Sequence, residues 1–154
     1  MLQKILPLLF LSFLSLALRA TSSNPNPSLT AYDELNRTGF PIGLLPSGIL
    51  SYSLNLTTGD FAVDLADHCR VTLPPDNYLA VYSKRITGQL VDRKISGLDG
   101  IRVRAFFRWW SITTIRSTGD DLVFDVGVAS AKYPAKNFYE TLDCQGSNGK
   151  KASS

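Results

Sequence analysis

Side chains alternate in character along residues 101–110, and this alternation constrains the fold more than any other feature of the chain. Apolar residues hold every second position, and three arginines and two aromatic residues hold the positions between them: Ile101, Val103, Ala105, Phe107 and Trp109 in the first set, Arg102, Arg104, Phe106, Arg108 and Trp110 in the second. A period of two is typical of a β-strand. We expect one long strand over residues 101–116, a turn over residues 118–120, and a second strand over residues 122–128.

The rest of the chain shows the same period in shorter segments that are separated by turns. Such segments begin near positions 49, 61, 69, 78 and 94, and Asp99-Gly100 is a dipeptide that often closes a β-hairpin. About eight short strands at this spacing predict an all-β, mainly antiparallel domain, either a barrel-like sheet or a sandwich. We favour a barrel, because closure leaves no exposed sheet edge.

One short helix precedes the strands. Thr30 and Asp33 have the spacing of a capping box, and Gly39 stands where a helix commonly ends in a left-handed residue. We predict a helix over residues 31–38. The loop over residues 40–48 holds two prolines and two glycines among apolar residues, which indicates a backbone shaped for close packing.

The N-terminus has the layout of a secretory signal peptide. Lys4 is followed by an apolar run over residues 5–18, and Ala20 offers a small residue for cleavage. The alternative is a transmembrane anchor, but the run is shorter than the roughly 20 residues that a span needs. We expect a signal peptide over residues 1–20, a flexible leader over 21–29, a single domain over 30–144 and a disordered tail over 145–154. The protein would then be secreted, to the extracellular space or within the secretory pathway.

The two cysteines and two sequons agree with secretion. Cys69 and Cys144 form an even count, which predicts one disulfide in an oxidising compartment. The alternative is two unpaired buried thiols. Asn36 and Asn55 each begin an Asn-x-Thr sequon, so both are candidate glycosylation sites.

Charge and residue spacing argue against several functions. The chain has 16 lysines and arginines and 13 acids, and removal of residues 1–20 would leave a net charge near +1, with no block of like charge. A nucleic-acid partner is therefore not expected. The cysteines lack metal-ligand spacing, so we expect no metal and no cofactor. His68 is the only histidine, and no catalytic partner stands near it in the sequence, so no catalytic residue is predicted.

The set Arg102, Arg104, Phe106, Arg108 and Trp110 is the candidate ligand-binding site. Guanidinium groups bind carboxylates or phosphates and also stack on aromatic rings. Such a stripe suits an anionic lipid headgroup or a sugar acid. The alternative is a solvated strand face that is crossed by cation–π contacts or is paired with acids on a neighbouring strand. A second group of aromatic residues either lines a cavity or belongs to a packed core: Tyr52, Tyr78, Tyr82, Phe107 and Trp109.

Several segments resemble the plant domain of unknown function 538 family. They lie at positions 31–32, 39–46, 86–88, 98–101, 124–127, 133–134 and 137–138, and the two cysteines also fit. The resemblance covers residues 31–144. It implies a β-barrel-like fold in a small secreted plant protein. The family has been compared with lipid-binding bactericidal permeability-increasing proteins and has been proposed to hold hydrolases, but it offers no catalytic residues to carry over.

The function expected from both lines of reasoning is the binding of an amphipathic or lipid-like ligand. Apolar residues of the barrel would hold its tail, and the arginines its anionic head. Contact with a membrane surface or the cell wall would accompany this role. Two alternatives stay open: a hydrolase that acts on an ester or a cell-wall substrate, and a module that binds cell-wall carbohydrate.

Overall fold

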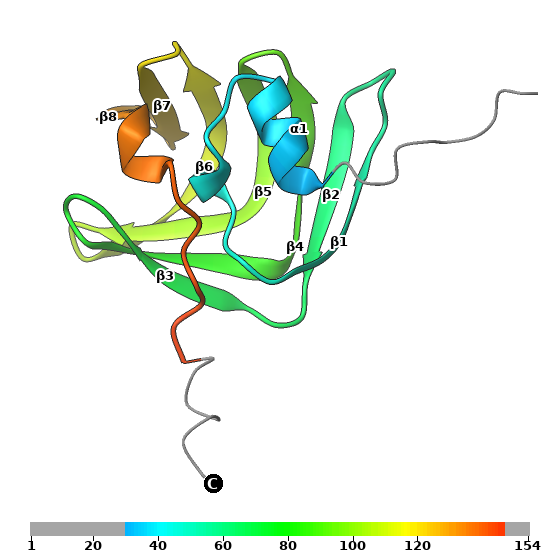
Figure 1. Ribbon diagram of the computed structural model, residues 1–154. Coiled ribbons are helices and arrows are strands. Elements are labelled where there is room, and N and C mark those ends of the chain that lie inside the picture. The colour runs from blue at the N-terminus through cyan, green and yellow to red at the C-terminus, as the bar shows by residue number, and fades with distance from the viewer. Residues whose placement is uncertain (1–29, 147–154) are drawn as a thin grey trace, which may run out of the picture.

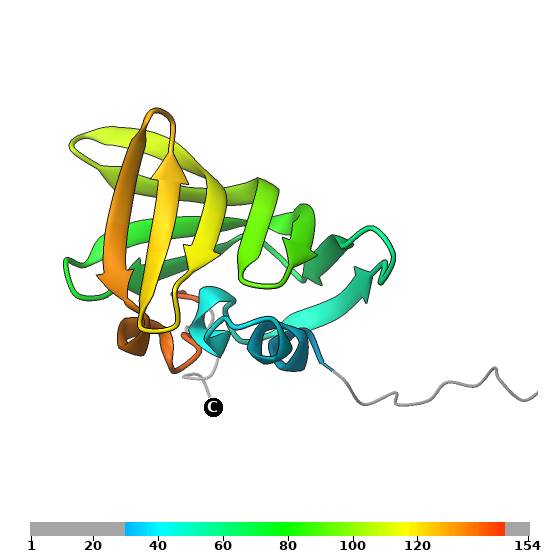
Figure 2. The same cartoon turned by 90° about the horizontal axis from the view of Figure 1, so that it is seen from above.

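A computed structural model of the protein describes residues 30–146, which form a curled antiparallel sheet with short helices along one side (Figures 1 and 2). The strands are β1 (Ile49–Leu54), β2 (Asp60–Leu65), β3 (Cys69–Leu73), β4 (Tyr78–Val91), β5 (Lys94–Ala105), β6 (Arg108–Ser117), β7 (Asp121–Val126) and β8 (Ala129–Pro134). The helices are α1 (Ala31–Arg37) and the 3-10 turns η3 (Ile42–Leu44) and η4 (Ala135–Phe138). The all-β prediction with one short α-helix is confirmed.

The predicted signal peptide and leader lie outside the described residues, as does the predicted tail beyond residue 146. Across residues 30–146, no helix combines the length and the apolar content that crossing a bilayer requires.

The two longest strands, β4 and β5, run through both halves of the sheet. The sheet order is β1-β2-β4-β5-β6-β7-β8, and β3 pairs with β4 beside this path. The first half of β4 pairs with β3 and the second half with β2, so β4 joins the part of the sheet that holds β3 to the part that holds β1 and β2. Strands β1 and β8 end this order without pairing to each other in the described part of the chain. The sheet is therefore curled but open.

The predicted hairpin at Asp99-Gly100 is wrong, because both residues lie inside β5. The turn is two residues long and lies earlier, since Val91 pairs with Lys94. Gly100 instead marks a bend, with φ +112°. A Cβ atom there would lie 2.7 Å from the carbonyl oxygen of Arg85, so the glycine lets β5 cross close to β4.

The single long strand predicted over residues 101–116 is also wrong. It is divided by a two-residue turn at Phe106 and Phe107 between β5 and β6. Because Ala105 pairs with Arg108, the alternation shifts by one position at the turn. The shift reverses the faces of every later residue in the pattern, and this reversal rearranges the predicted site.

Helix α1 and the loop after it cover one side of the sheet (Figure 1). Thr30 and Asp33 form the predicted capping box, and Gly39 has φ +92° at the helix end. The Arg93 N–H donates to the Thr38 carbonyl at 2.7 Å, and the Ser117 hydroxyl donates to the Gly39 carbonyl at 2.7 Å. These two bonds attach the end of α1 to the β4–β5 turn and to the end of β6.

The C-terminal segment is fixed along the free edge of β3. Cys69 and Cys144 form the predicted disulfide, with Cα atoms 5.0 Å apart. The backbone N–H of Gln145 donates to the carbonyl of Arg70 at 2.7 Å, and its side chain donates to Thr72 at 2.6 Å. The segment therefore covers backbone groups that an edge strand would otherwise expose.

Candidate functional site

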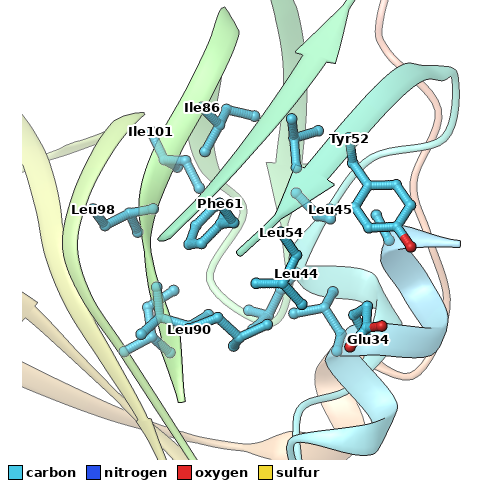
Figure 3. A pocket seen from close by; sticks show the side chains of 15 residues that line it. Glu34, Leu44, Leu45, Tyr52, Leu54, Phe61, Ile86, Leu90, Leu98 and Ile101 are labelled. Carbon is cyan, nitrogen blue, oxygen red and sulfur yellow. The ribbon is translucent and has the colours of Figure 1, made fainter. Parts of the chain in front are cut away.

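Two apolar hollows lie inside the curled sheet, and the smaller one lies under α1 (Figure 3). Its volume is about 50 Å³, room for one or two water molecules at about 30 Å³ each. Every lining residue is apolar or aromatic except Glu34, whose carboxylate is held by Arg37 at 2.7 Å. This hollow is a gap in the core and is too small for a ligand.

The larger hollow lies between β5 to β8 and the β3–β4 turn and has a volume of about 300 Å³. Ligand pockets range from roughly 300 to 1,000 Å³, so this cavity stands at the lower end of that range. Its walls come from the adjoining ends of β3 and β4 with their turn, from β5 to β8 with the β5–β6 turn, and from η4. The lining residues are Leu73, Pro74, Tyr78, Val103, Ala105, Phe106, Trp110, Ile112, Phe124, Val126, Ala129, Ser130, Ala131, Tyr133 and Phe138.

Small side chains on facing strands explain why this volume is not filled. Ala105 on β5 and Ala129 and Ala131 on β8 line the cavity. The larger side chains on β7, Phe124 and Val126, lie beside these alanines in register. Since a β-strand points alternate residues to one face, a run of alanines at alternate positions removes side-chain volume along a whole line.

Polar groups gather where β8 approaches the β3–β4 turn. The Tyr133 hydroxyl donates to the Asp76 carboxylate at 3.4 Å. Burial, reinforced by Tyr78 and by the negative charge of Asp76, raises the pKa of Tyr133 to about 12. The neutral hydroxyl thus remains a hydrogen-bond donor at physiological pH. This contact joins β8 to the β3–β4 turn where no backbone pairing does.

The predicted arginine stripe is divided between two faces of the β5–β6 hairpin. Arg108 is on the cavity face, opposite Ala105, with its guanidinium 5.2 Å from the ring centre of Trp110. Trp110 and Phe106 line the cavity. Arg108 itself is exposed and does not line the cavity, but it stacks on Trp110, which is one of the cavity walls.

Arg102 and Arg104 lie on the opposite, outer face. Their guanidinium groups are 5.5 and 5.7 Å from the ring centre of Trp109. Of the five predicted residues, Phe106 and Trp110 therefore line the cavity and Arg108 stacks beside them, whereas Arg102 and Arg104 are separated from it. The cation–π contacts of the alternative interpretation are present on both faces.

The aromatic residues predicted to line a cavity also separate. Tyr78 lines the larger cavity and Tyr52 the smaller one. Tyr82 is buried and donates to the Leu44 carbonyl at 2.8 Å, and its burial raises the pKa of its hydroxyl. Phe107 and Trp109, by contrast, are exposed. Tyr133, Asp76 and the alanines of β8 were not predicted, because sequence alternation gives the face of a strand but not which strands meet.

His68 lies in a surface hollow beside the disulfide. Ser47, Asp67 and Asp143 line the same hollow, a grouping that the sequence did not reveal because it joins three distant segments. The Ser47 hydroxyl donates to Asp143 at 2.6 Å, and the His68 side chain makes no hydrogen bond with any residue in 30–146. A Ser–His pair needs such a bond between nucleophile and base. Within residues 30–146, Ser47 and His68 thus form no hydrogen-bonded nucleophile–base pair.

Asn36 and Asn55 are both exposed. Asn36 lies in α1, and the Asn55 side-chain carbonyl accepts hydrogen bonds from the backbone N–H groups of Thr57 and Thr58. Within residues 30–146, no group of three or more His, Cys, Asp or Glu side chains is placed to hold a metal ion.

Comparison with known proteins gives one match. The model of a family described as a protein of unknown function, DUF538, matches residues 31–139. No curated protein and no solved structure matches the chain significantly. The match covers α1 and all eight strands, and its description assigns no activity.

Proposed function

The chain belongs to the DUF538 family of proteins of unknown function, and from that premise we propose that it binds an amphipathic, lipid-like ligand in the larger cavity. The observation that carries the proposal is an apolar cavity of about 300 Å³ with one cation, Arg108, stacked on the outside of its wall residue Trp110. The apolar tail lies among the side chains of β5 to β8. The anionic head pairs with Arg108.

The apolar walls and Arg108 contribute to binding in different ways. Burial of apolar surface supplies affinity at roughly 25 cal/mol per Å². A charge-assisted hydrogen bond from a guanidinium group fixes which end of the ligand faces out. Within residues 30–146, Arg108 makes no ion pair with a carboxylate, so its charge is available to a ligand.

The test compares two ligands that differ only in the head, lauric acid and dodecanol. We expect Ala131→Phe, which fills the cavity, to abolish binding of both. Arg108→Gln should weaken binding of lauric acid about tenfold, from the loss of a charged hydrogen bond, and leave dodecanol unchanged. Arg102→Gln on the outer face is the matched control and should bind both ligands like the wild type.

Calorimetric titration gives both affinities directly. Equal binding of lauric acid by wild type and Ala131→Phe, with the fold intact by circular dichroism, would show that the cavity is not the site. Mass spectrometry of organic extracts from natively purified protein would identify the ligand that the cavity carries.

We also propose that the protein is secreted. The pattern of Lys4, the apolar run and Ala20 supports this, and so does the disulfide, since such bonds persist in oxidising compartments. Intact-mass analysis of protein from its native tissue should give an N-terminus near Thr21. An N-terminus at Met1 would contradict it. Release of glycan by peptide N-glycosidase would test Asn36 and Asn55.

A further inference from the structure

The β5–β6 turn exposes two adjacent phenylalanines. Phe106 is 80% exposed and Phe107 94% exposed, and Trp109 beside them is 39% exposed. Single exposed apolar residues are ordinary on a protein surface, but contiguous ones mark an interaction site. In both views the turn projects from the same side of the molecule as the β3–β4 turn, at the end far from the β1–β2 turn (Figures 1 and 2).

The backbone of this turn also departs from what its sequence favours. Phe106 has φ +53° and Phe107 has φ +64°. A two-residue hairpin turn with both residues at positive φ prefers Asn and Gly, because other side chains are strained there. The chain thus keeps two bulky and largely exposed aromatic rings in a strained position, and such outliers point to function.

Cationic residues stand directly behind the tip. Arg104 is two residues and Arg102 four residues from Phe106, or about 7 and 13 Å along the strand. Two rows of cross-strand pairs run over the outer face from β3 to β6. The first row consists of Arg70, Val81, Arg102 and Ser111, and the second consists of Thr72, Leu79, Arg104 and Trp109. Neither row holds an acid, and within residues 30–146 Arg102, Arg104 and Arg108 form no ion pair.

From this arrangement we propose that the β5–β6 turn docks the protein on an anionic lipid bilayer. Phe106 and Phe107 enter the boundary between headgroups and acyl chains, which lies about 5–10 Å deep for inserted apolar residues. The arginines behind them meet the lipid phosphates, and Trp109 takes the interfacial position that tryptophan favours. A bilayer suits this surface better than a protein, because a narrow convex tip needs no matching pocket in a fluid partner.

The docked orientation places one wall of the cavity at the membrane, because Phe106 belongs both to the tip and to the cavity wall. Arg108 stacks on Trp110 of the same wall. Docking itself does not require an occupied cavity, so it stands independently of the proposed function.

The experiment uses vesicles of phosphatidylcholine with and without phosphatidylserine, and protein whose N-terminus has been established by mass spectrometry. The chain has two tryptophans, Trp109 and Trp110, both beside the tip. Their emission should shift to the blue on binding to phosphatidylserine vesicles, and lipids brominated near the headgroup should quench it. Co-sedimentation measures the partition coefficient.

We expect Phe107→Ser to lower this partition coefficient about tenfold, since a buried phenylalanine ring is lost. Phe107 does not line the cavity, so lauric acid binding should persist in this variant. Arg102→Gln and Arg104→Gln should each lower vesicle binding about fivefold. Leu56→Ser, at an 81% exposed leucine in the β1–β2 turn, and Lys84→Gln are the matched controls and should bind like the wild type.

Equal vesicle binding by wild type and Phe107→Ser would overturn the proposal. So would sedimentation data in which wild type self-associates, Phe107→Ser is monomeric, and neither binds vesicles, because the tip would then be an interface between copies of the chain. The cavity variant Ala131→Phe should still dock. Loss of lauric acid binding with retained docking, or the reverse, therefore separates a failure of this inference from a failure of the proposed function.

Discussion

Phe106 and Phe107 combine an unfavourable backbone conformation with exposed apolar side chains. A non-glycine residue at positive φ costs about 1 kcal/mol or more, and these exposed rings recover little of it by packing. Natural proteins keep such strain where activity depends on it. The arginines and tryptophans beside the turn are ordinary strand residues, so the strain is local to the tip.

The double change Phe106→Asn, Phe107→Gly should therefore raise the free energy of unfolding by about 1 kcal/mol or more, because Asn-Gly suits this turn. Urea denaturation measures it, with Leu56→Asn in the β1–β2 turn as a control that should have little effect. A less stable double variant would mean that the rings support the fold. A more stable variant that no longer binds vesicles would exclude unfolding as the cause of lost docking.

Tyr133 predicts a loss of stability at alkaline pH. Its folded pKa of about 12 lies above the ordinary tyrosine pKa of 10.0, so the folded state holds the proton more tightly than the unfolded state does. The stabilisation is present in full below pH 10 and is lost as the pH rises from 10 to 12. The same direction holds for buried Tyr82.

Between pH 9 and 12, the free energy of unfolding of Tyr133→Phe should decline less steeply than that of the wild type, because the variant has no hydroxyl to titrate at this position. Urea denaturation at each pH measures both. Tyr139→Phe is a matched control, since Tyr139 is 62% exposed. Parallel declines in Tyr133→Phe and wild type would show that Tyr133 does not carry the effect.

At the scale of elements, close packing between η3 and the segment after η4 holds the two ends of the domain together. Gly43 lies in η3, and a Cβ atom there would lie 2.5 Å from the carbonyl oxygen of Glu140 and would also meet the carbonyl of Phe138. Backbone atoms cannot move aside as a flexible side chain can. The glycine-rich loop over residues 40–48 is thus a packing surface, as its composition indicates.

Gly43→Ala should destabilise the fold by about 1–3 kcal/mol, the usual range for overpacking. Gly48→Ala is not a clean control, because Gly48 has φ +84°. The better control is Ser53→Ala, because Ser53 is exposed on β1. A melting temperature for Gly43→Ala equal to that of Ser53→Ala would contradict this account of the loop.

At the scale of the whole molecule, the disulfide and the Tyr133–Asp76 contact hold a sheet that does not close on itself. The disulfide joins residues 75 apart, and a loop of that length is worth about 4 kcal/mol in the chain-entropy model. It also keeps the C-terminal segment along the edge of β3. An open curled sheet leaves its inner face accessible between strands, which is where the larger cavity lies.

Replacement of Cys69 and Cys144 by alanine should lower the free energy of unfolding by about 2–4 kcal/mol, measured by urea denaturation against wild type. The same variant should expose the β3 edge and aggregate more readily on heating, as light scattering would report. A double variant as stable as the wild type would show that the hydrogen bonds of Gln145 suffice to hold the segment.

The sequence by itself determined the features that depend on local chemistry. The capping residues Thr30 and Asp33 set the start of α1, side-chain alternation set the strands, and an even cysteine count indicated the disulfide. The helix start and the strands follow from neighbouring residues in the chain, and two cysteines allow only one intramolecular disulfide. The family assignment also followed from residues in sequence.

Only the tertiary structure decided where the strands turn and which faces meet. Asp99-Gly100 suits a hairpin locally, but the approach of β5 to Arg85 gives Gly100 another use. Phe106-Phe107 is a poor turn by its own propensity, so the alternation hid the turn that moves Arg108 to the cavity and leaves Arg102 outside. Register between strands far apart in the chain is set by packing over the whole sheet, and local sequence does not contain that information.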